Sequence, residues 1–256
     1  MKNKNLIIII LIIIVLLASG GFYLYKKSQG NKAENETEEL ATTEPTEILS
    51  QEEKEETTKK EPEKRVLMFG RSVMAGWFNY WGSEELSAVK KEGFTLEYKN
   101  VYEPPEIVEG FKEYINDISK NENPIIFFKF CFVDFEGSSK SNAQKNLQRN
   151  EKYIEEIYET TKSKGLKLII GNALPQVPSS TDNYLKWNHD QYNKRLIEFQ
   201  KKYPQDVFIF DMYNVLSDSS GYLRARYTND LYDSHPNEKA YSVLDLEFFK
   251  LLKKNF

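Results

Sequence analysis

The stretch VLMFGRS at residues 66–72 is a short apolar run that ends in a glycine, an arginine and a serine. A run of this length before a turn residue indicates a buried strand. Four further segments have the character of strands: 94–101, 124–132, 166–170 and 207–210. Helical patterns separate them, most clearly at 143–163, which Gly165 follows, and a last helix is expected at 238–253. This alternation predicts a five-stranded parallel sheet with helices on both faces.

The chain of 256 residues divides into three zones by composition. Residues 6–25 are apolar almost throughout, and about 20 such residues cross a bilayer core. Residues 1–25 are therefore expected to form a membrane anchor, with a cleaved signal peptide as the alternative. Residues 26–64 are rich in Glu, Thr and Lys and contain no aromatic residue, which predicts a disordered linker. Residues 65–256 have the length of one folded domain, expected on the outer side of the membrane.

Charge and residue counts exclude several kinds of site. The net charge is −4, and a chain without a basic surplus is not expected to bind nucleic acid. The chain has one cysteine, Cys131, and two histidines, His189 and His235. No intramolecular disulfide can form, and neither can a cysteine-based zinc or iron–sulfur site. We therefore expect neither a metal nor a cofactor.

Ser72 comes directly after the first expected strand. In a parallel sheet covered by helices, ligands bind beyond the carboxyl ends of the strands. A helix that begins there directs its free backbone N–H groups at the same place. Ser72 is therefore a candidate nucleophile for a reaction that forms an oxyanion. The alternative is that its hydroxyl caps the helix.

A second candidate segment, NDLYDSHPN at 229–237, precedes the last expected helix. A serine nucleophile needs a base to take its proton, and the base needs a carboxylate to orient its ring. His235 is the candidate base, Asp233 the candidate orienting acid and Asp230 the alternative acid. The competing interpretation is an ordinary helix start with Asn237 as its cap.

Gly-x-Ser near the start of the domain and Ser-His-Pro-Asn near its end resemble the SGNH (GDSL-like) hydrolase family. The resemblance covers about 66–256 and implies a three-layer α/β/α, flavodoxin-like fold. It also implies serine ester hydrolysis or acyl transfer, with Ser72 as nucleophile and His235 as base. The family usually has an aspartate three residues before the histidine, where this chain has Tyr232. Asp233, two residues before, takes that role in our interpretation.

The chain departs from the family pattern around the expected oxyanion site. The usual Gly-Asp-Ser contains Arg71 in place of the aspartate, and the second block, at 100–105, has no glycine. The third block, usually Gly-x-Asn-Asp, contains Val133 in place of the asparagine that donates to the oxyanion. Candidate replacement groups are Arg71, Asn100 and Lys129. Lys129 lies inside an apolar strand, and its alternative is a strand-end lysine that extends to water.

Other notable residues have simpler interpretations. Cys131 is expected to be a buried, inert thiol because it lies in an apolar run. His189 is expected at the surface. An aromatic cluster follows Ser72 and either stacks on sugar rings or packs in the core; its members are Trp77, Phe78, Tyr80 and Trp81.

Together these features predict a serine esterase anchored in the cell membrane by residues 6–25, with its single domain outside. Its expected partner is an ester-bearing substrate, such as an acylated carbohydrate, and secretion after signal cleavage is the alternative location. Two other functions remain open at this point. One is an acyltransferase acting on surface polymers, and the other is a non-catalytic binding module of the same fold.

Overall fold

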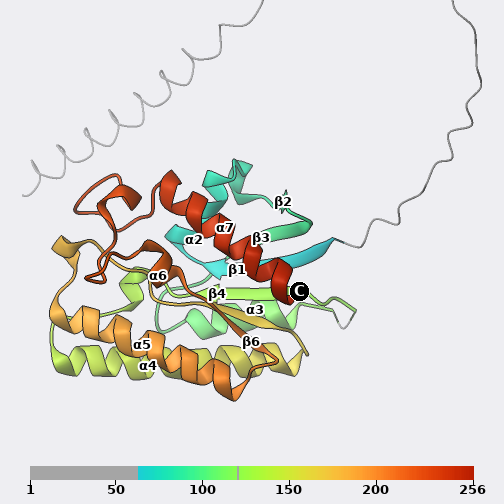
Figure 1. Cartoon of the computed structure of the whole chain (residues 1–256). Helices are drawn as coiled ribbons and strands as arrows, with labels where there is room; N and C mark the ends of the chain where they lie inside the picture. The colour runs from blue at the N-terminus through green and yellow to red at the C-terminus, as the bar shows by residue number, and fades with distance from the viewer. Residues whose placement is uncertain (1–62, 120) are drawn as a thin grey trace, which may run out of the picture. The chain divides into compact units, whose positions relative to one another are not determined.

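The computed structural model describes residues 63–119 and 121–256 (Figure 1). The membrane anchor expected at 1–25 and residues 26–62 of the expected linker lie outside the described residues. Among the residues described, no helix is long and apolar enough to cross a membrane. The first strand begins at Lys64, one residue before the predicted start of the domain.

Strands and helices alternate along the described chain, as the sequence predicts. The strands are β1 (Lys64–Gly70), β2 (Val89–Lys91), β3 (Phe94–Asn100), β4 (Ile125–Lys129), β5 (Leu168–Gly171) and β6 (Val207–Phe210). The helices are α2 (Ser72–Tyr80), α3 (Ile107–Asn116), α4 (Lys140–Ser163), α5 (Asn183–Lys202), α6 (Met212–Leu216) and α7 (Glu238–Asn255). Short 3-10 turns lie at Glu84–Leu86, Phe132–Asp134, Pro178–Ser180 and Ala225–Tyr227.

The sheet has six strands in the order β2-β3-β1-β4-β5-β6. The five predicted strands are parallel and follow the flavodoxin-like order, with β1 at the centre between β3 and β4. The prediction of a purely parallel, five-stranded sheet is wrong at one edge, where β2 pairs antiparallel with β3. The three residues Val89-Lys90-Lys91 contain one apolar side chain, so they give no apolar run to mark a strand.

Alternating side chains of the strands build two separate cores, one on each face of the sheet. Val66 and Met68 of β1 belong to the core that α2 and α7 cover. Leu67 and Phe69 belong to the core beneath α3, α4 and α5. Figure 1 shows α2 and α7 on one side of the sheet and α4 and α5 on the other. The predicted three-layer arrangement is therefore present, and both faces of the central strands are buried.

The aromatic residues after Ser72 pack in the core rather than on the surface. Trp77 and Phe78 are fully buried, which excludes both from stacking on a sugar. The Trp77 ring lies 5.3 Å from that of Phe248 and 6.0 Å from that of Phe210, measured between ring centroids. Tyr80 and Trp81 are partly buried and pack against the same core. This cluster fixes α2, and with it Ser72, against the sheet.

We predict that Trp77→Ala lowers the free energy of unfolding by about 3–5 kcal/mol, because it leaves a cavity between α2, α7 and the sheet. Chemical denaturation measures the change. Leu246→Ala on α7 is the control, since Leu246 is 69% exposed and its loss is expected to stay within about 0.5 kcal/mol. Equal losses for the two variants would contradict this description of the core.

Candidate active site

Ser72 lies at the carboxyl end of the central strand, as the first residue of α2. The first N–H groups of a helix have no partner inside the helix, so the Ser72 N–H is available to a ligand. Arg71, not Ser72, occupies the capping position, and no side chain caps this helix. The turn is tight, because a Cβ atom at Gly70 would lie 2.9 Å from the Cβ of Met74. Because it does not cap the helix, the Ser72 hydroxyl is free to react.

The segment before α7 brings His235 and Asp233 to Ser72. The Nε2 atom of His235 lies 3.1 Å from the Oγ of Ser72. On the other side of the ring, Nδ1 lies 2.6 Å from Oδ1 of Asp233. These partners select the tautomer with the proton on Nδ1, which leaves Nε2 to accept the serine proton. The three side chains form the hydrogen-bonded chain that nucleophilic catalysis by serine requires.

The structure places the two candidate aspartates differently. The carboxylate of Asp233 accepts hydrogen bonds from both the backbone N–H and the ring of His235. The hydrogen bond from the His235 backbone N–H lowers the pKa of Asp233 most, and the hydrogen bond from the His235 ring lowers it further. Asp233 is therefore held as a carboxylate. Asp230 instead accepts the backbone N–H of Tyr232 at 2.8 Å and stabilises the loop. Asp233 is thus the residue in position to orient His235.

Contacts from three other segments hold this loop in place. Ser234 accepts the backbone N–H of Val177 at 3.1 Å, which ties the loop to the segment after β5. The ring of Phe132 packs with its edge near His235, with 4.9 Å between the ring centroids. Asn237 caps α7 by accepting the N–H of Ala240 at 3.1 Å. Residues 229–237 therefore both start helix α7, through Asn237, and bring His235 to Ser72.

Arg71 is fixed by a buried carboxylate. One terminal nitrogen of its guanidinium pairs with Oδ1 of Asp134, and the other Asp134 oxygen accepts the Cys131 N–H at 2.8 Å. Asp134 is 2% exposed, and this burial raises its pKa while Arg71 opposes the rise. The second terminal nitrogen of Arg71 is buried without a hydrogen-bond partner, 4.0 Å from the nearest carboxylate oxygen, on Glu103.

The remaining oxyanion candidates differ in their exposure. Asn100 is exposed at the end of β3, opposite Gly70 in the sheet register, and accepts a hydrogen bond from the Tyr98 hydroxyl at 3.0 Å. Lys129 is 1% exposed and its ammonium has no hydrogen-bond partner. The interpretation of Lys129 as a lysine that extends to water is wrong, because its side chain is buried against Gly70 of β1 and Gly171 of β5. Val133, in the place of the family's asparagine, is exposed.

Two further residues lie where the sequence alone did not place them. Cys131 is buried as expected, but its Sγ lies 3.7 Å from the Oγ of Ser72. His189 is buried, contrary to the prediction, and its ring packs against Phe135 with 5.0 Å between centroids. Burial lowers the pKa of His189 to about 4, so it stays neutral near pH 7. Its spacing from Leu185 and Tyr192 on one face of α5 was the signal for this burial.

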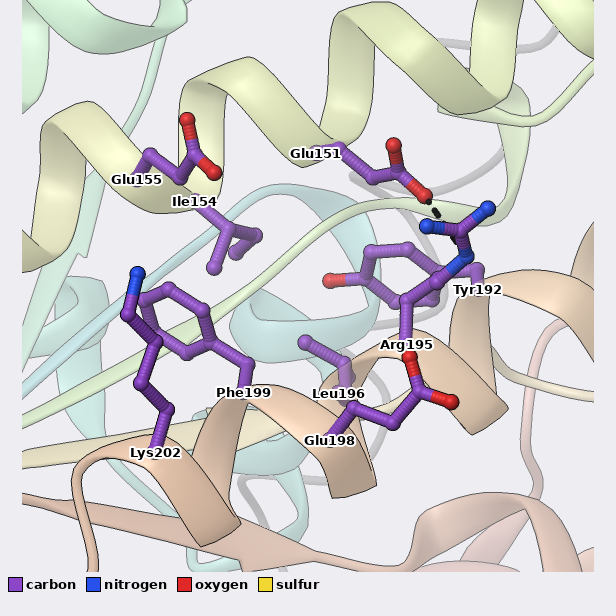
Figure 2. Close-up of a pocket in the computed structure, with 9 residues that line it drawn as sticks. All are labelled: Glu151, Ile154, Glu155, Tyr192, Arg195, Leu196, Glu198, Phe199 and Lys202. Carbon is purple, nitrogen blue, oxygen red and sulfur yellow. Dashed lines mark ion pairs between the residues drawn. The ribbon is translucent and has the colours of Figure 1, made fainter.

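A pocket of about 220 Å³ lies between α4 and α5, away from these residues (Figure 2). Its lining comprises Glu151, Ile154, Glu155, Tyr192, Arg195, Leu196, Glu198, Phe199 and Lys202. Neither Ser72 nor His235 lines it. Within residues 63–119 and 121–256, no three His, Cys, Asp or Glu side chains are grouped so that they could hold a metal ion.

The fold is α/β, and Ser72, His235 and Asp233 form a Ser–His–Asp arrangement at the carboxyl end of its sheet. A provisionally assigned acylhydrolase from Bacteroides fragilis is 21% identical, with a TM-score of 0.56 over 76% of this chain and 88% of that one. A GDSL-like lipase from Bacteroides thetaiotaomicron is 15% identical, with a TM-score of 0.53 over 76% and 90%. A member of the lipolytic G-D-S-L family from Veillonella parvula is 15% identical, with a TM-score of 0.56 over 74% and 98%.

No family model matches the sequence, and no curated protein matches it. The likeness to solved structures therefore concerns the fold, and that fold is the one of the SGNH/GDSL-like hydrolases. The architecture expected from the Gly-x-Ser and Ser-His-Pro-Asn segments is thus confirmed.

We predict that Asp134→Asn lowers the free energy of unfolding by about 3–5 kcal/mol, because it leaves the buried Arg71 guanidinium without its counter-charge. Thermal or chemical denaturation measures this loss. Glu247→Gln is the matched control, since Glu247 pairs with Lys250 at 3.4 Å on the exposed face of α7 and contributes under about 1 kcal/mol. A loss at Asp134 no larger than at Glu247 would contradict the anchoring role of Asp134.

Proposed function

We propose that this protein is a serine ester hydrolase with Ser72 as nucleophile, His235 as general base and Asp233 as orienting acid. The observation that supports this most strongly is the chain of short contacts, 3.1 Å from Ser72 to His235 and 2.6 Å from His235 to Asp233. A binding module does not need such an alignment. The contacts also lie at the carboxyl end of the parallel strands, where proteins with such sheets bind their ligands.

The geometry supports a two-step reaction. Nε2 of His235 takes the proton of the Ser72 hydroxyl as Oγ bonds to the ester carbonyl carbon, and the carbonyl oxygen becomes an oxyanion. When that intermediate collapses, His235 gives the proton to the leaving alcohol and Ser72 keeps the acyl group. A water molecule then gives a proton to His235 and attacks the carbonyl carbon of the acyl-enzyme. When this second intermediate collapses, the bond from the acyl carbon to Oγ breaks, His235 returns the proton to Oγ of Ser72, and the acid is released. The Ser72 N–H at the start of α2 is directed at the developing oxyanion.

We further propose that the substrate is an acylated carbohydrate on the outer side of a membrane. The location rests on the apolar run at 6–25 and the charged segment that follows it. The carbohydrate rests on two tyrosines with exposed side chains, in the segments that follow β3 and precede His235. Tyr232 is 80% exposed in the His235 loop, and Tyr102 is 48% exposed just after β3. Exposed aromatic faces of this kind suit sugar rings.

We predict that Ser72→Ala abolishes covalent labelling by a fluorophosphonate probe and lowers aryl ester turnover by about 10⁴–10⁶-fold, since the nucleophile is removed. Cys131→Ala is the control, because it removes the side chain that contacts Ser72 without removing the hydroxyl, and most of the activity should remain. Labelling and turnover are measured on purified variants. Labelling that persists without Ser72, or that depends on Cys131 alone, would show that the nucleophile is misassigned.

We also predict that Asp233→Asn lowers turnover by about 10²–10⁴-fold, because it removes the carboxylate that orients His235 and stabilises its protonated form. Asp230→Asn, on the same loop, should change turnover by less than about threefold. The comparison uses the same ester and the same pH for both variants. If the larger loss occurs at Asp230, the assignment of the orienting acid is wrong; if neither matters, the enzyme works as a Ser–His dyad.

A further inference from the structure

The side chain of Lys129 lies beneath the turn that carries Ser72, in space that two glycines leave open. A Cβ atom at Gly70 would lie 3.6 Å from the Cγ of Lys129, and one at Gly171 would lie 2.9 Å from its Cβ. These glycines belong to β1 and β5, the strands on either side of β4. The stem of Lys129 therefore runs between the ends of three strands, and its ammonium is enclosed there without a hydrogen-bond partner.

A buried ammonium without a partner opposes folding, because its charge has been taken out of water. An apolar side chain of similar length would fill the same space without that penalty. Groups that are kept charged at such a cost occur where function needs the charge. Lys129 lies at the carboxyl end of β4, which pairs with β1, the strand that leads into Ser72, and such a need arises there.

The charges around Lys129 do not cancel. The charged and titratable groups that face its ammonium are Arg71 from the turn after β1, and Cys131 and Asp134 from the segment after β4. The single carboxylate among them already pairs with Arg71. Among these buried groups, two cations and one anion leave one positive charge, and the low dielectric of the interior leaves that charge poorly screened. The carboxylates of Glu103 and Asp233 are exposed, so water screens their charges.

The same site departs from the family pattern at two of the positions that donate to the oxyanion. Val133 has no amide side chain in the place of the family's asparagine, and residues 100–105 contain no glycine. The N–H of Ser72, at the start of α2, is free to donate to an oxyanion formed at this residue. Loss of one such donor lowers catalysis by about 10²–10³-fold in a well-studied case. A positive charge close to Ser72 has the right sign to compensate.

We propose that the buried ammonium of Lys129 stabilises, through its electric field, the oxyanion formed when Ser72 attacks an ester, in place of the missing asparagine amide. This inference rests on the proposed function. Because the ammonium is buried, Lys129 does not touch the substrate and is a positioning residue: it sets the potential in which Ser72 reacts. Arg71 and Asp134 hold the turn and the neighbouring loop at a fixed distance from that charge.

Lys129→Met tests the proposal, because it keeps the length of the side chain and removes its charge. At pH 7, kcat for an aryl acetate should fall by about 10–100-fold with KM changed less than about twofold. A boronic acid, which forms a negatively charged tetrahedral adduct with serine, should lose affinity by a similar factor. The melting temperature should rise, because the unpaired charge is gone. A loss of activity with a gain of stability excludes misfolding as the cause.

The pH dependence of activity distinguishes an effect of the charge of Lys129 from an effect of its shape. Burial lowers the pKa of Lys129 from 10.5 to about 8, so the folded protein gives up this proton at a lower pH than the unfolded chain. The ratio of wild-type to Lys129→Met activity should therefore fall towards one as pH rises from 7 to 10. Between about pH 8 and 10.5 the unfolded chain binds more protons than the folded protein, so the stability of the wild type rises with pH. The difference in melting temperature between Lys129→Met and the wild type should therefore narrow over this range.

Lys167→Met is the matched control, since Lys167 pairs with Asp206 at 2.8 Å at the opposite end of the sheet. It removes the same charge and should leave kcat unchanged. Lys129→Gln, a second neutral variant, should repeat the loss seen with methionine. The role of Lys129 would be overturned if the wild type is active and Lys129→Met is equally active at pH 7. It would also be overturned if the loss of activity in Lys129→Met does not change with pH. A wild type that neither reacts with the fluorophosphonate nor hydrolyses esters would instead overturn the proposed function.

Discussion

Asp134 joins parts of the site that lie far apart in the chain, through its side-chain carboxylate and its backbone carbonyl. The carboxylate binds Arg71, next to the nucleophile, and the N–H of Cys131. The carbonyl oxygen accepts hydrogen bonds from the side chains of Asn146, Asn150 and Arg149 at distances of 2.8–3.0 Å. The turn after β1, the loop after β4 and helix α4 are thereby held together. Without this interaction, a positive charge would be left unpaired beside Ser72.

This arrangement gives the site a different electrostatic character from one built on neutral donors. A neutral amide acts only along its hydrogen bond, so its contribution depends on an accurate position of the bound group. A buried charge acts at a distance and tolerates small shifts of the substrate. It also demands a rigid, dry environment, which the two layers of aromatic and aliphatic side chains around β1 and β4 provide. The stability of the core and the chemistry of the site are therefore linked.

Much of the fold was predictable from the sequence, because its determinants are local. Four of the five parallel strands are apolar runs and β3 alternates, and Ser72 and His235 lie in segments rich in turn-forming residues at the ends of elements. Strand β2 was missed because Val89-Lys90-Lys91 is held by its pairing with β3 rather than by its own pattern. The burial of His189 was missed, and the sequence left open whether Lys129 extends to water, for a related reason. Their environment is made by distant segments: Gly70 and Gly171 in one case, and Phe135 and Tyr213 in the other.

The assignment of Asp233 shows the same limit. Spacing from His235 could not separate it from Asp230, because both lie in one short loop. The distinction depends on how the loop turns, and that turn is fixed by contacts with Val177 and Phe132 from elsewhere in the chain. The pairing of Arg71 with Asp134 was likewise not accessible, since 63 positions separate the two residues.

The two halves of the nucleophile–base pair are 163 positions apart, on the first and last parts of the folded domain. Ser72 is presented by the central strand, whereas His235 arrives only when the loop before α7 docks against the finished sheet. A shortened chain ending before residue 235 would display an inert hydroxyl. The proposed Ser72–His235 pair therefore depends on contacts between the first and last parts of the domain, and it is complete only when the domain is folded. An assay of ester cleavage on a newly made chain would therefore report on completion of the whole domain.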